Sequence, residues 1–209
     1  MAQPNRRIAI AALIGAMTLA GGSALAASFD GDATLGNPKA KVKLVEYASL
    51  ACSHCAAFNN EVFAGFKKKY IDTGKVHYTL REILTQPREV AAAGFLTARC
   101  AGPANYFTVV DTMFHGFDKM AESGDVRGAL MAAGKAGGLT QVQVEACLTD
   151  EAAIAALNAR VAKNAELGNI TGTPTFVING KTVKEGPMTA AELDAAITQA
   201  LKPAKPASK

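Results

Sequence analysis

The pattern of apolar and polar positions predicts two strands joined by a helix in the first half of the chain. Residues 42–50 are mostly apolar, with Lys43 and Glu46 as the only charges, which is typical of a central strand buried on both faces. Apolar residues then recur at every fourth position and predict a helix that ends at Gly74: Phe58, Val62, Phe66 and Tyr70. Residues 76–81 alternate between apolar and polar and predict a second strand, parallel to the first through a right-handed crossover.

Residues 86–168 carry helical patterns instead of strand patterns. Pro87 suits the first turn of a helix, because proline lacks the backbone N–H that a first turn leaves unpaired. Thr140 and Asp150 are residue types that cap helix N-termini, and they indicate two later helix starts. The block interrupts the strand pattern and is therefore predicted to be a helical insertion.

The strand pattern resumes after the helical block. Residues 175–178 read as a strand, and Asn179-Gly180 is the strongest short signal for a hairpin turn into a returning strand at residues 181–184. Thr189 and Glu192 have the spacing of a capping box, which predicts the start of a last helix.

The first residues of the chain have the three parts of an export signal. Arg6 and Arg7 precede an apolar stretch at residues 8–20, and Ala24-Leu25-Ala26 has the small residues at its first and third positions that form a cleavage site. We expect a signal peptide of residues 1–26, cleaved near Ala26. A retained membrane anchor is the alternative, which several glycines in and after the apolar stretch disfavour.

The charge balance excludes little and favours no polyanionic partner. The formal net charge is +4, and removing Arg6 and Arg7 lowers it to about +2 in the mature protein. The sequence has no basic stripe interleaved with aromatic residues and no zinc-finger spacing, so nucleic-acid binding has no support. The tail at residues 202–209, with Pro203 and Pro206, is predicted to be disordered.

The motif Cys52-Ser53-His54-Cys55 lies where the first predicted strand gives way to the helix. A thiol at a helix N-terminus faces unpaired backbone N–H groups and the positive end of the helix dipole, and both favour the thiolate. Cys52 is therefore the expected nucleophile, and Cys55, one turn later, can close a redox-active disulfide with it. Protonated His54 would lower the pKa of Cys52 further, and a passive surface histidine is the alternative. An inert structural disulfide is the alternative.

With this motif at the start of the first helix, the element order predicts an α/β, thioredoxin-like fold with an inserted helical domain. The thioredoxin-like domain is discontinuous, at residues 27–85 and 169–201, and the insertion is residues 86–168. Over nearly all of residues 35–201 the chain resembles the DsbA-like periplasmic thiol-disulfide oxidoreductases of Gram-negative bacteria. Glu46, six residues before Cys52, matches the buried glutamate of that family.

The second match is Thr173-Pro174, at the place of the family's cis-proline. The resemblance implies that a cis bond there brings backbone close to Cys52 and exposes an edge with which a substrate chain pairs. An ordinary trans proline is the alternative. For Glu46 the resemblance and the cost of burying a carboxylate imply a proton-transfer role for Cys55, and a solvent-facing glutamate is the alternative.

Two positions depart from the best-known strong oxidant of the family. Ser53 replaces a proline of that oxidant, and Thr173 replaces a valine. Threonine before the cis-proline is frequent among the family's disulfide isomerases, which are dimers or trimers built through N-terminal extensions. Here residues 27–41 are too few for such a module, so we expect a monomer.

Cys100 and Cys147 are the remaining pair, and both fall in the helical block. An even cysteine count in an exported protein favours a second, structural disulfide. A pair that tunes the redox properties of Cys52 and Cys55 is the alternative.

The resemblance implies a periplasmic enzyme that passes the Cys52-Cys55 disulfide to reduced, partly unfolded secreted proteins through a mixed disulfide at Cys52. An inner-membrane partner would reoxidise it, and no cofactor or metal is expected. A disulfide isomerase or reductase is the nearest alternative. A module that binds copper or zinc through Cys52 and Cys55, with or without His54, is an alternative from another class. Two thiolates suit copper(I), whereas a closed zinc site would need more ligands than this motif supplies.

Overall fold

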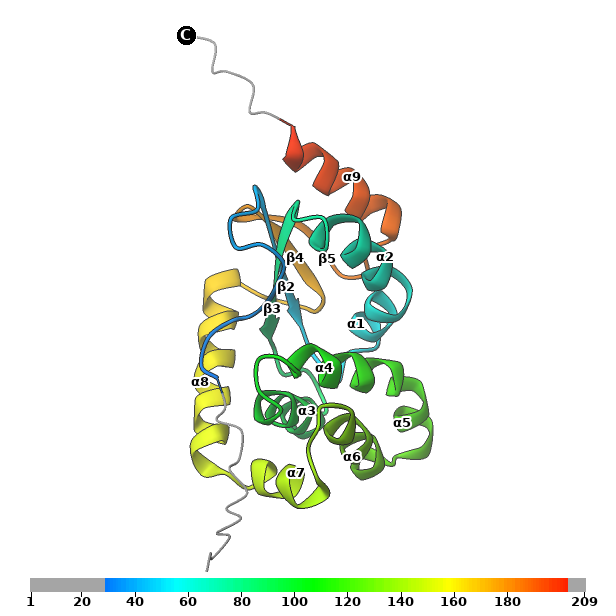
Figure 1. Ribbon diagram of the computed structural model, residues 1–209, viewed down its shortest axis with the longest axis vertical. Coiled ribbons are helices and arrows are strands. Elements are labelled where there is room, and N and C mark those ends of the chain that lie inside the picture. The colour runs from blue at the N-terminus through cyan, green and yellow to red at the C-terminus, as the bar shows by residue number, and fades with distance from the viewer. Residues whose placement is uncertain (1–28, 203–209) are drawn as a thin grey trace, which may run out of the picture.

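The computed structural model describes residues 29–202, so the predicted signal peptide (residues 1–26) and all but the first residue of the predicted tail lie outside the described residues. A mixed five-stranded sheet lies at the centre in the order β1-β3-β2-β4-β5 (Figure 1). Its strands are β1 (Ala33–Leu35), β2 (Val42–Ala48), β3 (Val76–Glu82), β4 (Thr175–Ile178) and β5 (Lys181–Glu185).

The central strand β2 pairs with a neighbour on each side. It runs parallel to β3, with Glu46 opposite Leu80, and antiparallel to β4, with Glu46 opposite Phe176. These pairings confirm the predicted buried strand and its parallel partner. The short edge strand β1, antiparallel to β3, was not predicted, because three residues are too few to show a periodic pattern.

Residues 53–71 form one helical rod that connects β2 to β3. It consists of α1 (Ser53–Phe58), the π-helical segment η1 (Asn59–Phe63), α2 (Ala64–Phe66) and the π-helical segment η2 (Lys67–Ile71). The predicted apolar stripe is buried along it. A strict four-residue repeat drifts around an α-helix of 3.6 residues per turn, and the wider π turns correct that drift. The π segments therefore keep the stripe against the sheet.

Six helices lie between β3 and β4, as the helical patterns predicted (Figure 1). They are α3 (Arg88–Cys100), α4 (Tyr106–His115), α5 (Phe117–Ser123), α6 (Val126–Ala136), α7 (Gln141–Leu148) and α8 (Glu151–Gly168). Thr140 and Asp150 cap α7 and α8 as predicted. Pro87 differs from expectation: it is the extended residue before α3 and not part of its first turn.

The last helix, α9 (Ala190–Leu201), lies beside the helical rod, whereas α8 runs on the opposite side of the sheet (Figure 1). Its capping box is present, since the Thr189 hydroxyl accepts from the Glu192 N–H and the Glu192 carboxylate accepts from the Thr189 N–H. Leu193 and Ile197 are buried. None of the helices within residues 29–202 has the length and apolar character needed to cross a membrane.

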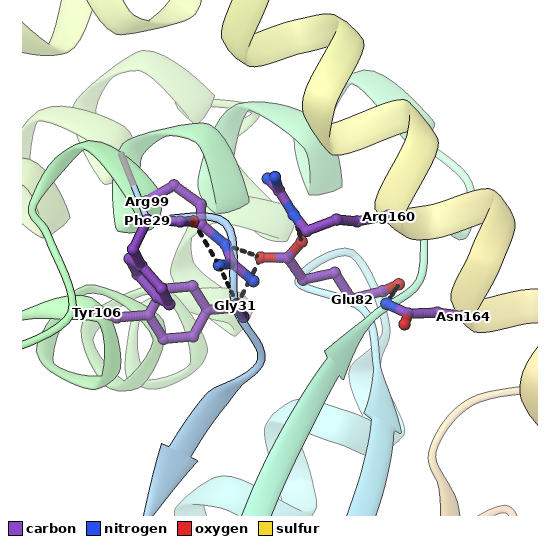
Figure 2. Close-up of polar contacts among 7 residues, drawn as sticks. All are labelled: Phe29, Gly31, Glu82, Arg99, Tyr106, Arg160 and Asn164. Carbon is purple, nitrogen blue, oxygen red and sulfur yellow. Dashed lines mark hydrogen bonds and ion pairs between the residues drawn. The ribbon is translucent and has the colours of Figure 1, made fainter. Parts of the chain in front are cut away.

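A buried carboxylate at the end of β3 joins the sheet to the insertion (Figure 2). Glu82 is fully buried, and one of its oxygens accepts from Arg99 Nε at 2.6 Å and from the Tyr106 hydroxyl at 3.1 Å. The other oxygen accepts from Arg160 Nε at 3.1 Å, and Asn164 donates to the Glu82 carbonyl. Helices α3, α4 and α8 therefore meet at one side chain.

The same cluster holds the start of the described chain. Arg99 donates to the carbonyls of Phe29 and Gly31, at 2.9 and 2.7 Å, and its guanidinium lies 4.2 Å from the centre of the Phe29 ring (Figure 2). The segment leading into β1 is thus tied to α3.

Candidate active site

Cys52 lies at the N-terminus of α1, directly after the loop that follows β2. It is the N-cap residue, in an extended conformation, and its carbonyl accepts from the N–H groups of Cys55 and Ala56. Its own N–H donates to the Ser49 carbonyl at 3.1 Å. The sulfur is half-buried, so it is within reach of solvent while the helix start fixes its position.

The surroundings of Cys52 favour its thiolate. Its pKa is lowered from 9.0 to about 5, first by a hydrogen bond from the Cys55 thiol, against the opposing effect of burial. Thr173 and the backbone N–H groups of Cys55 and His54 lower it further. As a thiol, Cys52 donates to the Thr173 carbonyl at 3.3 Å. The buried Thr173 hydroxyl has no other partner among residues 29–202 and is free to donate to the thiolate.

Cys55 has the opposite character. It is fully buried, and burial raises its pKa well above the usual value. Its hydrogen bond to Cys52 and the negative charges of Glu46 and Cys52 act in the same direction. Both cysteines are free thiols in this structure. The motif therefore combines an accessible thiolate with a buried thiol that holds its proton.

Glu46 is buried beneath these thiols and is 2% exposed, so the solvent-facing alternative is wrong. Burial raises its pKa from 4.5 to about 7, opposed by a hydrogen bond from the Tyr78 hydroxyl at 2.6 Å and assisted by the charge of Cys52. A carboxyl group with this pKa exchanges protons readily near neutral pH. Tyr78 was missed in the sequence, where it reads only as an apolar position of an alternating strand.

The Thr173-Pro174 peptide bond is cis, so the trans alternative is wrong. Pro174 directly precedes β4, and Thr173 contacts Cys52 through its carbonyl. The structure therefore brings together Cys52, Cys55, Glu46, Thr173 and Pro174 from α1, β2 and the start of β4.

His54 is exposed on α1. It lines a shallow groove of about 290 Å³ next to the active-site helix, and the other walls are mainly apolar side chains of the rod and of the segment before α9: Phe58, Val62, Pro187 and Met188. This groove offers an apolar surface close to Cys52.

Ser49 supports the active-site loop and was also missed by sequence reasoning. Its fully buried hydroxyl oxygen accepts from the Thr85 hydroxyl at 2.9 Å, from the Thr85 N–H at 3.2 Å and from the Ala51 N–H at 3.3 Å. These bonds tie the loop before Cys52 to the loop after β3. A lone serine between apolar residues gives no sequence signal for such a partner.

Cys100 and Cys147 form a disulfide with a Cα–Cα distance of 6.2 Å, within the ordinary range. It joins the end of α3 to α7, inside the insertion. Within residues 29–202, no three His, Cys, Asp or Glu side chains gather as a metal-binding group.

Comparison with known proteins gives consistent similarities. A family model described as thioredoxin matches residues 28–199. A protein of Rickettsia conorii named "Putative protein-disulfide oxidoreductase" is 35% identical over 181 residues, covering 86% of this chain and 64% of that protein. A protein of the same name from Rickettsia prowazekii is 37% identical over 156 residues, covering 72% of this chain and 55% of that protein. The chain spans less than two thirds of the length of either relative.

Among solved structures, alpha-DsbA1 of Wolbachia pipientis is similar with a TM-score of 0.70 and 26% identity, over 81% of this chain and 90% of that one. BdbD of Bacillus subtilis in its oxidised form has a TM-score of 0.72 at 20% identity, over 81% and 92% of the two chains, which is a likeness of fold. These similarities agree with the predicted α/β, thioredoxin-like fold with a helical insertion.

Proposed function

This chain belongs to the thioredoxin family, and from that premise we propose that it is a DsbA-type protein-disulfide oxidoreductase of the periplasm. It donates the Cys52-Cys55 disulfide to reduced, partly unfolded secreted proteins. The observation that carries this proposal is the contrast between the two thiols, because the pKa of Cys52 is lowered to about 5 while that of buried Cys55 is raised. The names of the Rickettsia relatives support the same reaction class.

In the first step a substrate thiolate attacks the Cys52 sulfur of the oxidised enzyme. The Cys52-Cys55 bond breaks as the new S–S bond forms, and Cys55 leaves with the electron pair. A buried thiolate is costly at this position, so Cys55 takes a proton, and Glu46 is its proposed donor because its raised pKa lies near neutral pH. The products are a mixed disulfide at Cys52 and a Cys55 thiol.

In the second step another thiolate of the substrate attacks the substrate's own sulfur in the mixed disulfide. Cys52 leaves as a thiolate, and a leaving group with a low pKa departs faster. The substrate has lost two electrons to the cysteine pair and gained a disulfide. Stabilisation of the departing thiolate therefore makes the protein an oxidant.

The reduced enzyme must return its two electrons to an acceptor. By analogy with the family, an inner-membrane partner takes them through a disulfide exchanged with Cys52. Cys55 then attacks the mixed disulfide, and Glu46 accepts its proton. The groove beside His54 would hold apolar side chains of the substrate, and the enzyme acts as a monomer.

Thr173 favours a second candidate, a disulfide isomerase, because its carbonyl contacts the reactive sulfur and its buried hydroxyl has no hydrogen-bond partner in the described part of the chain. Recovery of active ribonuclease from the scrambled form separates the candidates. An oxidase forms disulfides in reduced ribonuclease but leaves the scrambled protein inactive, whereas an isomerase restores its activity.

The reduction potential of the Cys52-Cys55 pair tests the proposal directly. We expect a value above about −180 mV in glutathione buffers, on the oxidising side of the isomerase range. The measurement requires mature protein with the Cys100-Cys147 disulfide intact. A value near −270 mV, the range of thioredoxin, would overturn the proposal in favour of a reductase.

A further inference from the structure

Tyr78 is the hydrogen-bonding partner of the buried acid of the active site. It lies on β3, two residues before Leu80, which is the register neighbour of Glu46. The Tyr78 side chain is 2% exposed, and its hydroxyl donates to Glu46 Oε2 at 2.6 Å. Within residues 29–202 this is the sole hydrogen bond of the Glu46 carboxyl group, and the Tyr78 hydroxyl makes no other.

The Tyr78 ring has little freedom to leave this position. Three aromatic rings from three different segments surround it, with centres at 5.1, 6.2 and 6.0 Å: Phe63 of η1, Phe66 of α2 and Phe107 of α4. Such packing fixes the direction in which the hydroxyl points. A rigid donor in turn fixes the carboxyl group that accepts from it.

Within residues 29–202, none of the groups that act on the Glu46 carboxyl group is a cation. The groups that affect its charge are Cys52 and Cys55 at the start of α1 and Tyr78 on β3. Tyr106 of α4 in turn affects the charge of Tyr78. Its register neighbours on both sides, Leu80 and Phe176, are apolar. Among the described residues, the neutral phenol of Tyr78 is therefore the one group that opposes the cost of burying the carboxylate.

We propose that Tyr78 is the positioning residue of the proton step: its hydroxyl occupies Glu46 Oε2 and leaves Oε1 to exchange the proton with Cys55. This inference rests on the proposed role of Glu46 in thiol exchange. The hydrogen bond from Tyr78 also affects the pKa of Glu46, because a donated hydrogen bond stabilises the carboxylate more than the acid. Tyr78 thereby lowers the pH at which Glu46 becomes a base.

The test is Tyr78→Phe, which removes the hydroxyl and keeps the ring among its aromatic neighbours. The rate of exchange between glutathione and the Cys52-Cys55 pair is followed against pH. We expect the midpoint of the pH–rate profile that reports the ionisation of Glu46 to rise by about one pH unit, which is a tenfold change in proton affinity. The thiolate absorbance of Cys52 should titrate as in the unaltered protein.

Tyr106→Phe is the matched control. Tyr106 is also fully buried and also donates to a buried carboxylate, Glu82, at 3.1 Å. Its loss should leave the midpoint in place. Glu46→Gln should abolish the midpoint, and adding Tyr78→Phe to it should change nothing more. A midpoint in Tyr78→Phe equal to that of the unaltered protein would overturn the proposal.

A second variant keeps the test open if Tyr78→Phe does not fold. A fluorinated tyrosine at position 78 retains the size and packing of the ring and is a stronger donor, so the midpoint should fall instead of rise. An unmoved midpoint again counts against the role of Tyr78. Exchange with glutathione requires no protein substrate, so a failure to oxidise secreted proteins would refute the proposed function alone.

Discussion

At the residue scale, the chemistry of the site arises from unequal burial of three ionisable side chains. Cys52 reaches solvent and is surrounded by donors, so its thiolate is favoured. Cys55 and Glu46 are buried among apolar side chains, so their neutral forms are favoured. In the reduced pair the negative charge is therefore favoured on Cys52, while Cys55 keeps its proton.

Glu46 should reduce the stability of the protein at alkaline pH. The pKa of Glu46 is 4.5 in the unfolded chain and about 7 in the folded protein. The folded state is therefore fully stabilised, as far as Glu46 is concerned, below pH 4.5, and it loses this stability as pH rises through about 7. Glu46→Gln should therefore raise the free energy of unfolding at pH 8 by about 3 kcal/mol and leave it unchanged at pH 4. Chemical denaturation at the two pH values measures this.

Glu61→Gln is the control for that comparison, because Glu61 is exposed on the same helical rod and makes no side-chain hydrogen bond in the described part of the chain. Its stability should match that of the unaltered protein at both pH values. An equal gain at pH 4 and pH 8 in Glu46→Gln would contradict the linkage to ionisation.

At the element scale, sequence periodicity predicted the strands at the centre of the sheet and the helix that carries the cysteines. It also predicted the caps at Thr140, Asp150 and Thr189, because capping depends on residues three positions apart. Periodicity did not predict β1, because the pairing of β1 depends on the distant strand β3. It also did not predict the π segments, although the four-residue spacing of the apolar stripe is consistent with them. Local patterns reveal local structure.

The Glu82 cluster could not be predicted for the same reason. Its members come from β3, α3, α4 and α8, and each looks like an ordinary charged or polar residue in the sequence. Tyr78 and Ser49 were missed likewise, although Glu46 and both cysteines were found. Short motifs identified the reacting groups, whereas their supporting partners required the fold.

Removing the charge of Glu82 should destabilise the contacts between the sheet and the helical insertion. Glu82→Gln leaves Arg99 buried without a counterion, and breaking a buried ion pair from one side costs about 3–5 kcal/mol. Thermal or urea unfolding measures the loss. The surface pair of Arg127 and Glu145 provides the control, since Glu145→Gln should leave the stability nearly unchanged. Equal effects of the two substitutions would contradict this role of burial.

At the scale of the whole molecule, a helical insertion sits between the two parts of a thioredoxin-like sheet domain (Figure 1). The insertion carries its own disulfide, away from the residues that form the reactive site. Glu82 connects the two parts at the end of β3, through its bonds to Arg99, Tyr106 and Arg160. The Cys100-Cys147 disulfide can therefore be removed without removing a reacting group.

Removing the Cys100-Cys147 disulfide tests that separation. The pair closes a loop of 47 residues, and Cys100→Ala with Cys147→Ala should lower the free energy of unfolding by up to about 4 kcal/mol on the chain-entropy estimate. The reduction potential of Cys52-Cys55 should stay the same. A shifted potential in the double variant would instead identify Cys100-Cys147 as a pair that tunes the reactive one.

The contact between Cys52 and Thr173 joins residues 121 positions apart, which matters for how the site forms during synthesis and folding. Because synthesis runs from the N-terminus, Cys52 is made well before the segment that completes its site. Until Thr173 folds against Cys52, the nucleophile lacks one of the groups that lower its pKa. The reactivity of Cys52 is therefore a property of the complete fold and not of the Cys52-Ser53-His54-Cys55 motif alone.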